Sequence, residues 1–185
     1  MKKLLLALSC LLLTIGICSC SGGGLFGPAP TPTPVPQIDP VAILSPDEVY
    51  EALGYAYVPV IDGGLIYHDG DWRHSMTYVS DPKGQGDSVT VTVSQYTDTV
   101  TPETVWYTFD EKRQKRSDKE GVDGLGECAY IALPSIHVYD RGCSIDITAG
   151  SGDTREQKQL LILLAQKAVA NLANVIEPPV AKEVQ

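Results

Sequence analysis

The hydrophobic pattern of this chain changes its period near residue 150, and no other feature constrains the fold more. Before that point Val89, Val91 and Val93 alternate with polar residues, which predicts a strand with one buried face. After Thr154, which can cap a helix with Gln157 at the capping-box position, apolar residues recur at helical spacing. This helix should lay an apolar stripe on a sheet. The stripe comprises Leu161, Leu164, Ala165, Ala168, Leu172 and Val175.

The rest of the region supplies two shorter helices and further strands. Ser45-Pro46-Asp47-Glu48 predicts a helix start, and Gly54 its end. Thr101-Pro102-Glu103 predicts a second helix, in which Val105 and Phe109 form an apolar pair. Strands are expected over Tyr55–Ile66, Trp72–Ser80, Ala129–Leu133, Ser135–Tyr139 and Cys143–Thr148, with a turn over 81–86. The element order predicts an α+β fold: an antiparallel sheet of about five strands packed against two or three helices.

The first 20 residues have the pattern of an export signal. Lys2 and Lys3 precede an apolar run, Leu4 to Ile17, that is too short to stay in a membrane as a span. The run ends at Ile17-Cys18-Ser19-Cys20, which resembles the lipobox of bacterial lipoproteins. The resemblance implies cleavage before Cys20 and attachment of acyl chains such as palmitate to it. A plain cleaved secretory signal and an amino-terminal anchor helix are the alternatives.

Composition then divides the chain into segments. Residues 1–19 are expected to be a lipoprotein signal peptide, and 20–44 a lipidated tether rich in glycine and then in proline. Residues 45–176 are long enough for one globular domain with its own core. Residues 177–185 are expected to form a flexible tail.

Charge excludes some classes of partner. The full chain carries a formal charge of -9, and removal of the signal, which holds two lysines and no acid, makes it more acidic. Binding to nucleic acid needs basic residues that neutralise phosphates, so a nucleic-acid partner is not expected. The same balance opposes adsorption of the folded domain to anionic headgroups. The expected membrane contact is therefore the amino-terminal lipid.

One short segment carries a family resemblance. Val122-Asp123-Gly124-Leu125-Gly126-Glu127-Cys128-Ala129-Tyr130 is similar to the Gly-Leu-Gly-acidic-x-Ala-aromatic segment of small exported bacterial lipoproteins of unknown function. Some of these domains are similar in architecture to the PsbP/Mog1 group, which implies an assembly or interaction module. The resemblance implies no functional residue, and Cys128 departs from its pattern.

The cysteines that remain after processing and lipidation are Cys128 and Cys143. An exported chain sits where disulfides persist, which favours a bond between them. Register gives the opposite prediction, because consecutive hairpins place the two cysteines two strands apart, beyond the reach of a bridge. Both outcomes stay open at the level of sequence.

Polar clusters could carry chemistry, but each lacks an obligatory part. His68, Asp69, Asp71 and His74 could form a loose surface metal site, although a solvated hairpin loop fits their spacing better. The 149–154 segment reads as helix capping, because it lacks the residues of a phosphate loop. His137 is interpreted as a structural histidine within a strand. The cations of 112–116 read as a solvated helix face, compensated by Asp110, Glu111, Asp118 and Glu120.

These observations favour a non-enzymatic binding or interaction module, lipid-anchored at the cell envelope, with its domain on the extracytoplasmic side. The partner would be an envelope protein or polymer, and no cofactor is expected. The anchoring membrane is the cell membrane or the outer membrane. One alternative is an envelope-polymer hydrolase that uses carboxylates such as Asp69, Asp71 or Glu127. Another is an accessory subunit of an envelope assembly.

Overall fold

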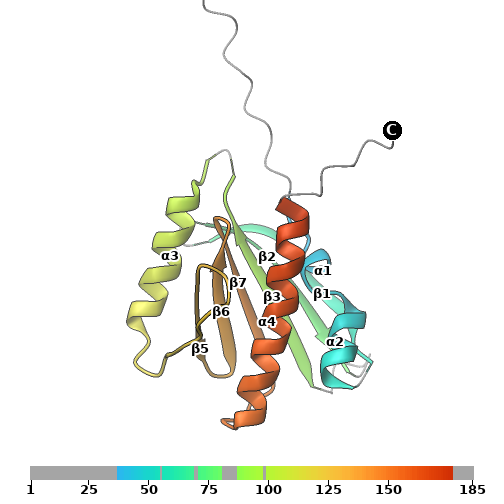
Figure 1. Ribbon diagram of the computed structural model, residues 1–185. Coiled ribbons are helices and arrows are strands. Elements are labelled where there is room, and N and C mark those ends of the chain that lie inside the picture. Colours follow the sequence, from blue (N-terminus) through green and yellow to red (C-terminus); the bar gives the residue numbers. More distant parts are fainter. Residues whose placement is uncertain (1–36, 55, 69–70, 81–86, 98, 177–185) are drawn as a thin grey trace, which may run out of the picture. The chain divides into compact units, whose positions relative to one another are not determined.

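The computed structural model describes residues 37–54, 56–68, 71–80, 87–97 and 99–176. These residues form a seven-stranded sheet in the order β1-β2-β3-β7-β6-β5-β4, with every neighbouring pair antiparallel (Figure 1). The strands are β1 Val58–His68, β2 Asp71–Val79, β3 Ser88–Gln95, β4 Glu120–Gly121, β5 Cys128–Ala132, β6 Ser135–Asp140 and β7 Cys143–Ala149. The predicted α+β class is confirmed. The sheet is larger than the five strands expected, in part because β4 is too short to show alternation.

Helices pack on both faces of this sheet. They are α1 Pro40–Ile43, α2 Pro46–Leu53, α3 Pro102–Lys115 and α4 Arg155–Ile176. Buried residues of α1, α2 and α4 share one core cluster with Ala129, whereas those of α3 share another with Tyr130. Successive strand residues point to opposite faces, so α3 lies on the face opposite the other helices. Figure 1 shows α4 crossing the sheet with α1 and α2 beside it. We call the two sides the α4 face and the α3 face.

Local sequence explains where the helices begin and end. Ser45 and Glu48 form the predicted capping box: the Glu48 amide donates to Ser45 Oγ at 3.3 Å and the Ser45 amide donates to Glu48 Oε2 at 2.8 Å. Gly54 ends α2 with φ 75°, which glycine adopts without steric cost. The Gln157 amide donates to Thr154 Oγ1 at 3.1 Å, as predicted, while the Gln157 side chain binds the Ala149 carbonyl.

The central sheet strands follow the predicted alternation. Val89, Val91 and Val93 are at most 1 % exposed on the α4 face, where the stripe of α4 covers them. By length and composition, α4 is also apolar enough to cross a membrane, the one such helix in the described part of the chain. Its Leu161, Leu164 and Leu172 are fully buried in the core, as in a helix that covers a sheet.

The domain boundary predicted at Ser45 is wrong. Ile38 is 2 % exposed, and Ile43 and Leu44 are fully buried in the α4-face core. The backbone of the same segment is also bound: the Ile38 amide donates to Gln95 Oε1 at 2.8 Å, and Tyr78 Oη donates to the Leu44 carbonyl at 2.5 Å. Residues 38–44 therefore belong to the domain. Residues 20–36 of the predicted tether and the predicted tail lie outside the described residues.

Candidate functional site

The α3 face carries polar cross-strand rows on its strands. One row runs Ser75, Thr92, Asp146, His137 and Tyr130 across β2, β3, β7, β6 and β5. A second row follows the same strands as Thr77, Thr90, Thr148, Ser135 and Ala132, and it contains hydrogen-bonded hydroxyl pairs. A sheet face with this composition needs a cover that is only partly apolar, and α3 supplies it.

His137 has a structural partner on this face, as its interpretation required. His137 Nδ1 lies 2.8 Å from Asp146 Oδ1, and the imidazole stacks on the Tyr130 ring with centroids 4.6 Å apart. Burial opposes ionisation of Asp146, but the hydrogen bond and the charge of His137 hold the pKa of this carboxyl below its usual value. The pair is thus an internal cross-strand bridge on the sheet.

Aromatic side chains gather where the first turns of α3 meet β5 and β6. The Val105 and Phe109 pair is buried as predicted and points from α3 onto Tyr130 and Tyr139. Trp106, next along the helix, meets the Tyr139 ring edge-on, with centroids 4.9 Å apart and planes at 64°. The indole also stacks on the Phe109 ring of the same helix, with centroids 5.8 Å apart. The cluster therefore fixes both rings before any ligand arrives.

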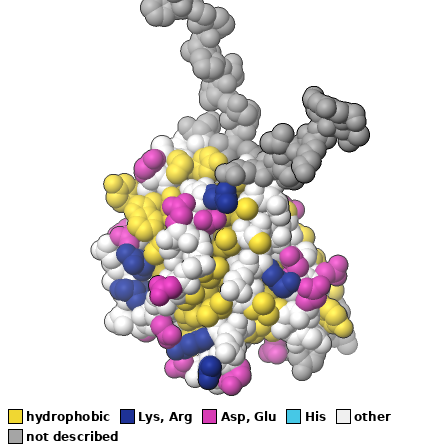
Figure 2. All heavy atoms as spheres, viewed as in Figure 1, with side chains coloured by type: hydrophobic (Ala, Val, Ile, Leu, Met, Phe, Trp, Pro, Cys, Tyr) yellow, Lys and Arg dark blue, Asp and Glu magenta, His cyan; other side chains and the backbone are white. Residues whose placement is uncertain are grey.

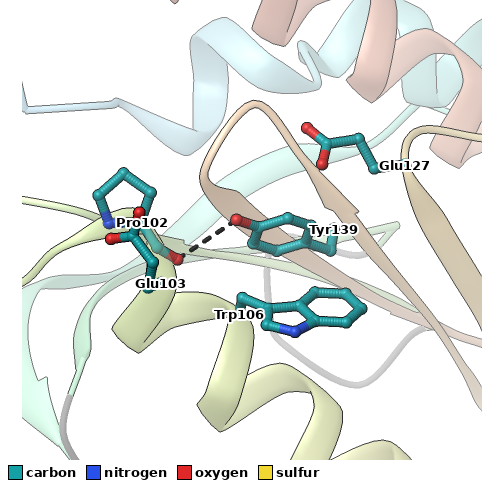
Figure 3. A pocket seen from close by; sticks show the side chains of 5 residues that line it. All are labelled: Pro102, Glu103, Trp106, Glu127 and Tyr139. Carbon is teal, nitrogen blue, oxygen red and sulfur yellow. Dashed lines mark hydrogen bonds between the residues drawn. The ribbon is translucent and has the colours of Figure 1, made fainter.

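A pocket of about 270 Å³ opens beside this cluster. We call it the Trp106 pocket. It is lined by Pro102, Glu103, Trp106, Glu127 and Tyr139 (Figure 3). Figure 3 shows the Tyr139 ring between the Glu127 carboxylate and Trp106, with Pro102 and Glu103 entering from the first turn of α3. In Figure 2, hydrophobic side chains lie beside acidic ones over this end of α3. The pocket combines aromatic surface with carboxylates at its rim.

The polar side chains of Tyr139, Glu103 and Glu127 in the pocket have identified hydrogen-bond partners. Tyr139 Oη donates to the Pro102 carbonyl at 3.3 Å, and burial, with the charge of Glu127, raises the pKa of its phenol. The Glu103 carboxylate accepts from its own amide and from Thr101, which lowers its pKa. Glu127 Oε1 accepts from the Arg141 amide at 2.9 Å. Tyr139 therefore offers the pocket a neutral ring, while Glu103 offers a negative charge.

The turn between β6 and β7 holds a lining residue of this pocket, Glu127, in place. Arg141 and Gly142 form its two-residue connection, both with positive φ, as the tight hairpin turns require. The Arg141 amide holds Glu127, and the backbone amide of Glu127 donates to the Tyr139 carbonyl at 3.0 Å. The segment before β5 and the hairpin of β6 and β7 thus meet at one rim.

The predicted metal cluster divides between different environments. His74 lies on β2, where its Nε2 is 2.7 Å from Asp62 Oδ1 and its Nδ1 is 3.2 Å from the Ile38 carbonyl oxygen. His68 and Asp71 oppose each other at the ends of β1 and β2, and Asp69 lies outside the described residues. His74 is 6 % exposed, so its placement in a solvated loop is wrong. Among the described residues, no group of His, Cys, Asp or Glu could hold a metal ion.

The predicted Cys128–Cys143 disulfide is not formed in this structure. Both thiols are free, and β6 separates their strands. Cys143 is fully buried on the α4 face, where burial raises the pKa of its thiol to about 12, and Cys128 packs against the α3-face cluster. The prediction from register, that the two cysteines lie two strands apart, is therefore confirmed.

Three of the four cations of 112–116 are compensated as predicted. Arg113 binds Asp110 and Lys115 binds Glu111, at 2.6 Å and 2.7 Å, and Arg116 binds Asp118 at 2.7 Å. Glu120 differs from the expectation, because it pairs with Lys158 of α4 instead. In the 149–154 segment, Thr154 performs the predicted capping.

Sequence reasoning missed Glu103, Trp106 and Tyr139 as site residues. Pro102 and Glu103 were read as a helix start, which they are, and Tyr139 as the end of a strand. One signal was present in the sequence: a tryptophan directly after the inward-facing Val105 lies at the edge of the buried stripe, half in contact with solvent.

Comparison with known proteins gives no relative, because no family model, curated protein or solved structure matches the chain. The similarity to exported lipoproteins and to the PsbP/Mog1 group stays a prediction.

Proposed function

We propose that this chain is a lipid-anchored bacterial envelope protein whose domain binds a ligand or partner without chemical turnover, and that binding occurs in the Trp106 pocket. The observation that carries the proposal is the aromatic wall of that pocket. Trp106 and Tyr139 are held by Phe109 and by the Pro102 carbonyl, so the wall is preorganised. Preorganised aromatic surface with few polar groups is typical of binding sites.

The state of the nucleophilic and acid–base groups supports binding over catalysis. The His137 imidazole is engaged by Asp146 and covered by Tyr130. The thiol of Cys143 is protonated and faces the opposite side of the sheet. Glu103 has a lowered pKa, which is unfavourable for a general acid, since that role needs a pKa near the working pH.

The amino-terminal sequence supplies the cellular setting of the proposal. Cys20 and the residues around it lie outside the described part of the chain, so lipidation remains an inference from the Ile17-Cys18-Ser19-Cys20 pattern. A lipid anchor would confine the pocket to the envelope. The partner would then be an envelope protein or polymer that is reachable from the membrane surface.

One observation favours a hydrolase as the second candidate. Glu103 and Glu127 line the same pocket, and paired carboxylates are the catalytic groups of glycoside hydrolases. In that case Glu127→Gln would abolish cleavage of an envelope polymer and leave polymer binding in place. Absence of cleavage by the unaltered protein would remove this candidate.

A binding experiment with matched aromatic variants tests the proposal. The protein with and without Trp106→Leu is compared for retention of solubilised envelope fractions, with Tyr107→Leu as the control. Tyr107 lies on the same helix, is 72 % exposed and does not line the pocket. We expect Trp106→Leu to lose retention and Tyr107→Leu to keep it. Equal retention by both variants would refute the assignment of the pocket.

Loss of Trp106 could also loosen the α3-face cluster, so a second variant is needed. Glu127→Gln keeps an oxygen acceptor for the Arg141 amide and changes only the charge at the rim. Melting temperatures of all variants should be measured in parallel. A retention defect in Glu127→Gln at unchanged melting temperature would point to the pocket itself.

A further inference from the structure

The charge of the Trp106 pocket selects among ligands. Among the described residues, its lining contains Glu103 and Glu127 and no lysine or arginine. The side chain of Arg141, whose amide binds Glu127, is engaged by Asp140, with Nε and Oδ2 3.4 Å apart. These two charges offset each other, so the pocket keeps the charge of its two carboxylates.

The hydrogen-bond donors and acceptors of the pocket lining restrict the class of ligand further. Carboxylates only accept hydrogen bonds, and the Tyr139 hydroxyl already donates to Pro102. The indole N–H of Trp106 has no partner among the residues that the structure describes, and it is the one remaining side-chain donor of the lining. A neutral sugar carries hydroxyls that need both donors and acceptors. A primary ammonium group only donates, which matches a rim that almost only accepts.

The aromatic wall favours the same class of ligand. The aliphatic stem that carries an ammonium group can pack on the ring of Tyr139 or on Pro102. A pocket of about 270 Å³ is large enough for such a stem and head group, and small for a folded polymer segment.

We propose that the Trp106 pocket binds a primary alkylammonium group, with the carboxylates of Glu127 and Glu103 as the acceptors of its rim and the aromatic wall packing against the alkyl stem. The inference rests on the proposed function and names the ligand class of that site. We assign the ammonium group to a lysine side chain of a partner polypeptide, because the hydroxyls of an amino sugar would need hydrogen-bond donors that this rim lacks. An amino sugar of an envelope polymer is the other outcome of the test. Both present the same head group to the rim.

The test uses a matched pair of probes on the full chain. Trp72→Phe leaves Trp106 as the single tryptophan, and its fluorescence is followed during titration. Nα-acetyl-lysine methylamide is compared with Nα-acetyl-norleucine methylamide, which has a similar stem but no ammonium group, at constant ionic strength. We expect the lysine amide to bind with a dissociation constant on the order of 1 mM and the norleucine amide to bind far more weakly.

Charge variants identify the acceptors. Glu127→Gln and Glu103→Gln should each weaken binding of the lysine amide about tenfold, because hydrogen bonds between ionised partners are about twice as strong as neutral ones. Glu156→Gln removes one negative charge from the exposed first turn of α4, outside the pocket lining, and should leave the affinity unchanged. A loss equal to that in Glu127→Gln would mean that only the net charge of the protein acts.

The possible results separate this inference from the proposed function. Equal responses to the two amides, or no response to either at about 10 mM, would overturn the ammonium assignment. Retention of envelope fractions that depends on Trp106 could still stand in that case. A parallel titration with glucosamine and glucose distinguishes the sources. Stronger binding of glucosamine than of the lysine amide would assign an amino sugar, and the reverse a polypeptide lysine.

Discussion

Gly142 is the residue on which the geometry of the Trp106 pocket most directly depends. It has φ 77° in the turn between β6 and β7, and a Cβ atom placed on it would lie 2.9 Å from Cβ of Pro102 and 3.2 Å from the Tyr96 ring. Pro102 opens α3 and lines the pocket. We expect Gly142→Ala to push the first turn of α3 away from the hairpin, and so to distort the pocket.

Gly124 provides a matched control for the magnitude. It has φ 74°, and its Cβ would meet no atom within 4 Å. Alanine in the left-handed region costs about 1–2 kcal/mol at either position. Gly142→Ala adds the clash with Pro102, and overpacking of this kind typically costs a further ~1–3 kcal/mol. The effect of alanine on the unfolded chain is the same in both variants and cancels in the comparison.

Thermal unfolding and tryptophan emission together test this reasoning. A destabilisation of 1 kcal/mol lowers the melting temperature of a domain of this size by about 2–4 °C, so Gly142→Ala should melt about 2–12 °C below Gly124→Ala. In the Trp72→Phe background, emission of Trp106 should shift only in Gly142→Ala. Equal melting temperatures and unchanged emission in both variants would refute the tight contact between the hairpin and α3.

Further predictions concern the core, the stability at low pH, the two thiols and the lipid anchor. Ile43→Ala should lower the free energy of unfolding, measured in urea, by about 2–5 kcal/mol. An unchanged free energy would mean that Ile43 belongs to the tether and not to the core. The Arg116 guanidinium lowers the pKa of Asp118 to about 2. This ion pair should contribute its full stabilisation above about pH 4, and the contribution should disappear as the pH falls towards 2. Arg116→Gln removes the pair, so its stability should not show this pH dependence. Thiol counting under denaturing, non-reducing conditions should find the thiols of Cys128 and Cys143 free. A count that lacks these two thiols would indicate a disulfide between them. A fatty-acid analogue should label the wild type and not Cys20→Ala; equal labelling would refute the lipid site.

Short-range sequence signals predicted the elements of this fold well. The capping box of Ser45 and Glu48 and the left-handed Gly54 depend on neighbours within one or two helical turns. The alternation of Val89, Val91 and Val93 likewise reports the environment of one strand. These signals are local, so they can be interpreted without knowledge of the rest of the fold.

The boundary of the domain could not be predicted in this way. Residues 38–44 follow a proline-rich stretch and include Pro40, so their composition resembles that of a tether. Their burial depends on distant partners: Gln95 accepts from the Ile38 amide, and Asn171 Nδ2 donates to the Ile43 carbonyl at 3.1 Å. Core membership that arises from such tertiary contacts has no local signature.

The candidate site has the same origin in long-range contacts. Glu103 and Trp106 come from α3, Tyr139 from β6 and Glu127 from the segment before β5, and each has a sufficient structural interpretation when taken alone. The α3 face also explains why a pocket forms at this place. Rows of serine, threonine and the His137–Asp146 pair cannot be sealed by an apolar helix without loss of solvation. Dense aromatic packing is therefore limited to the cluster around Phe109, and the pocket lies where that cluster meets the charged rim. Selection for binding would need to act only on the rim residues, because the ring cluster beneath them is already required to hold α3 on the sheet.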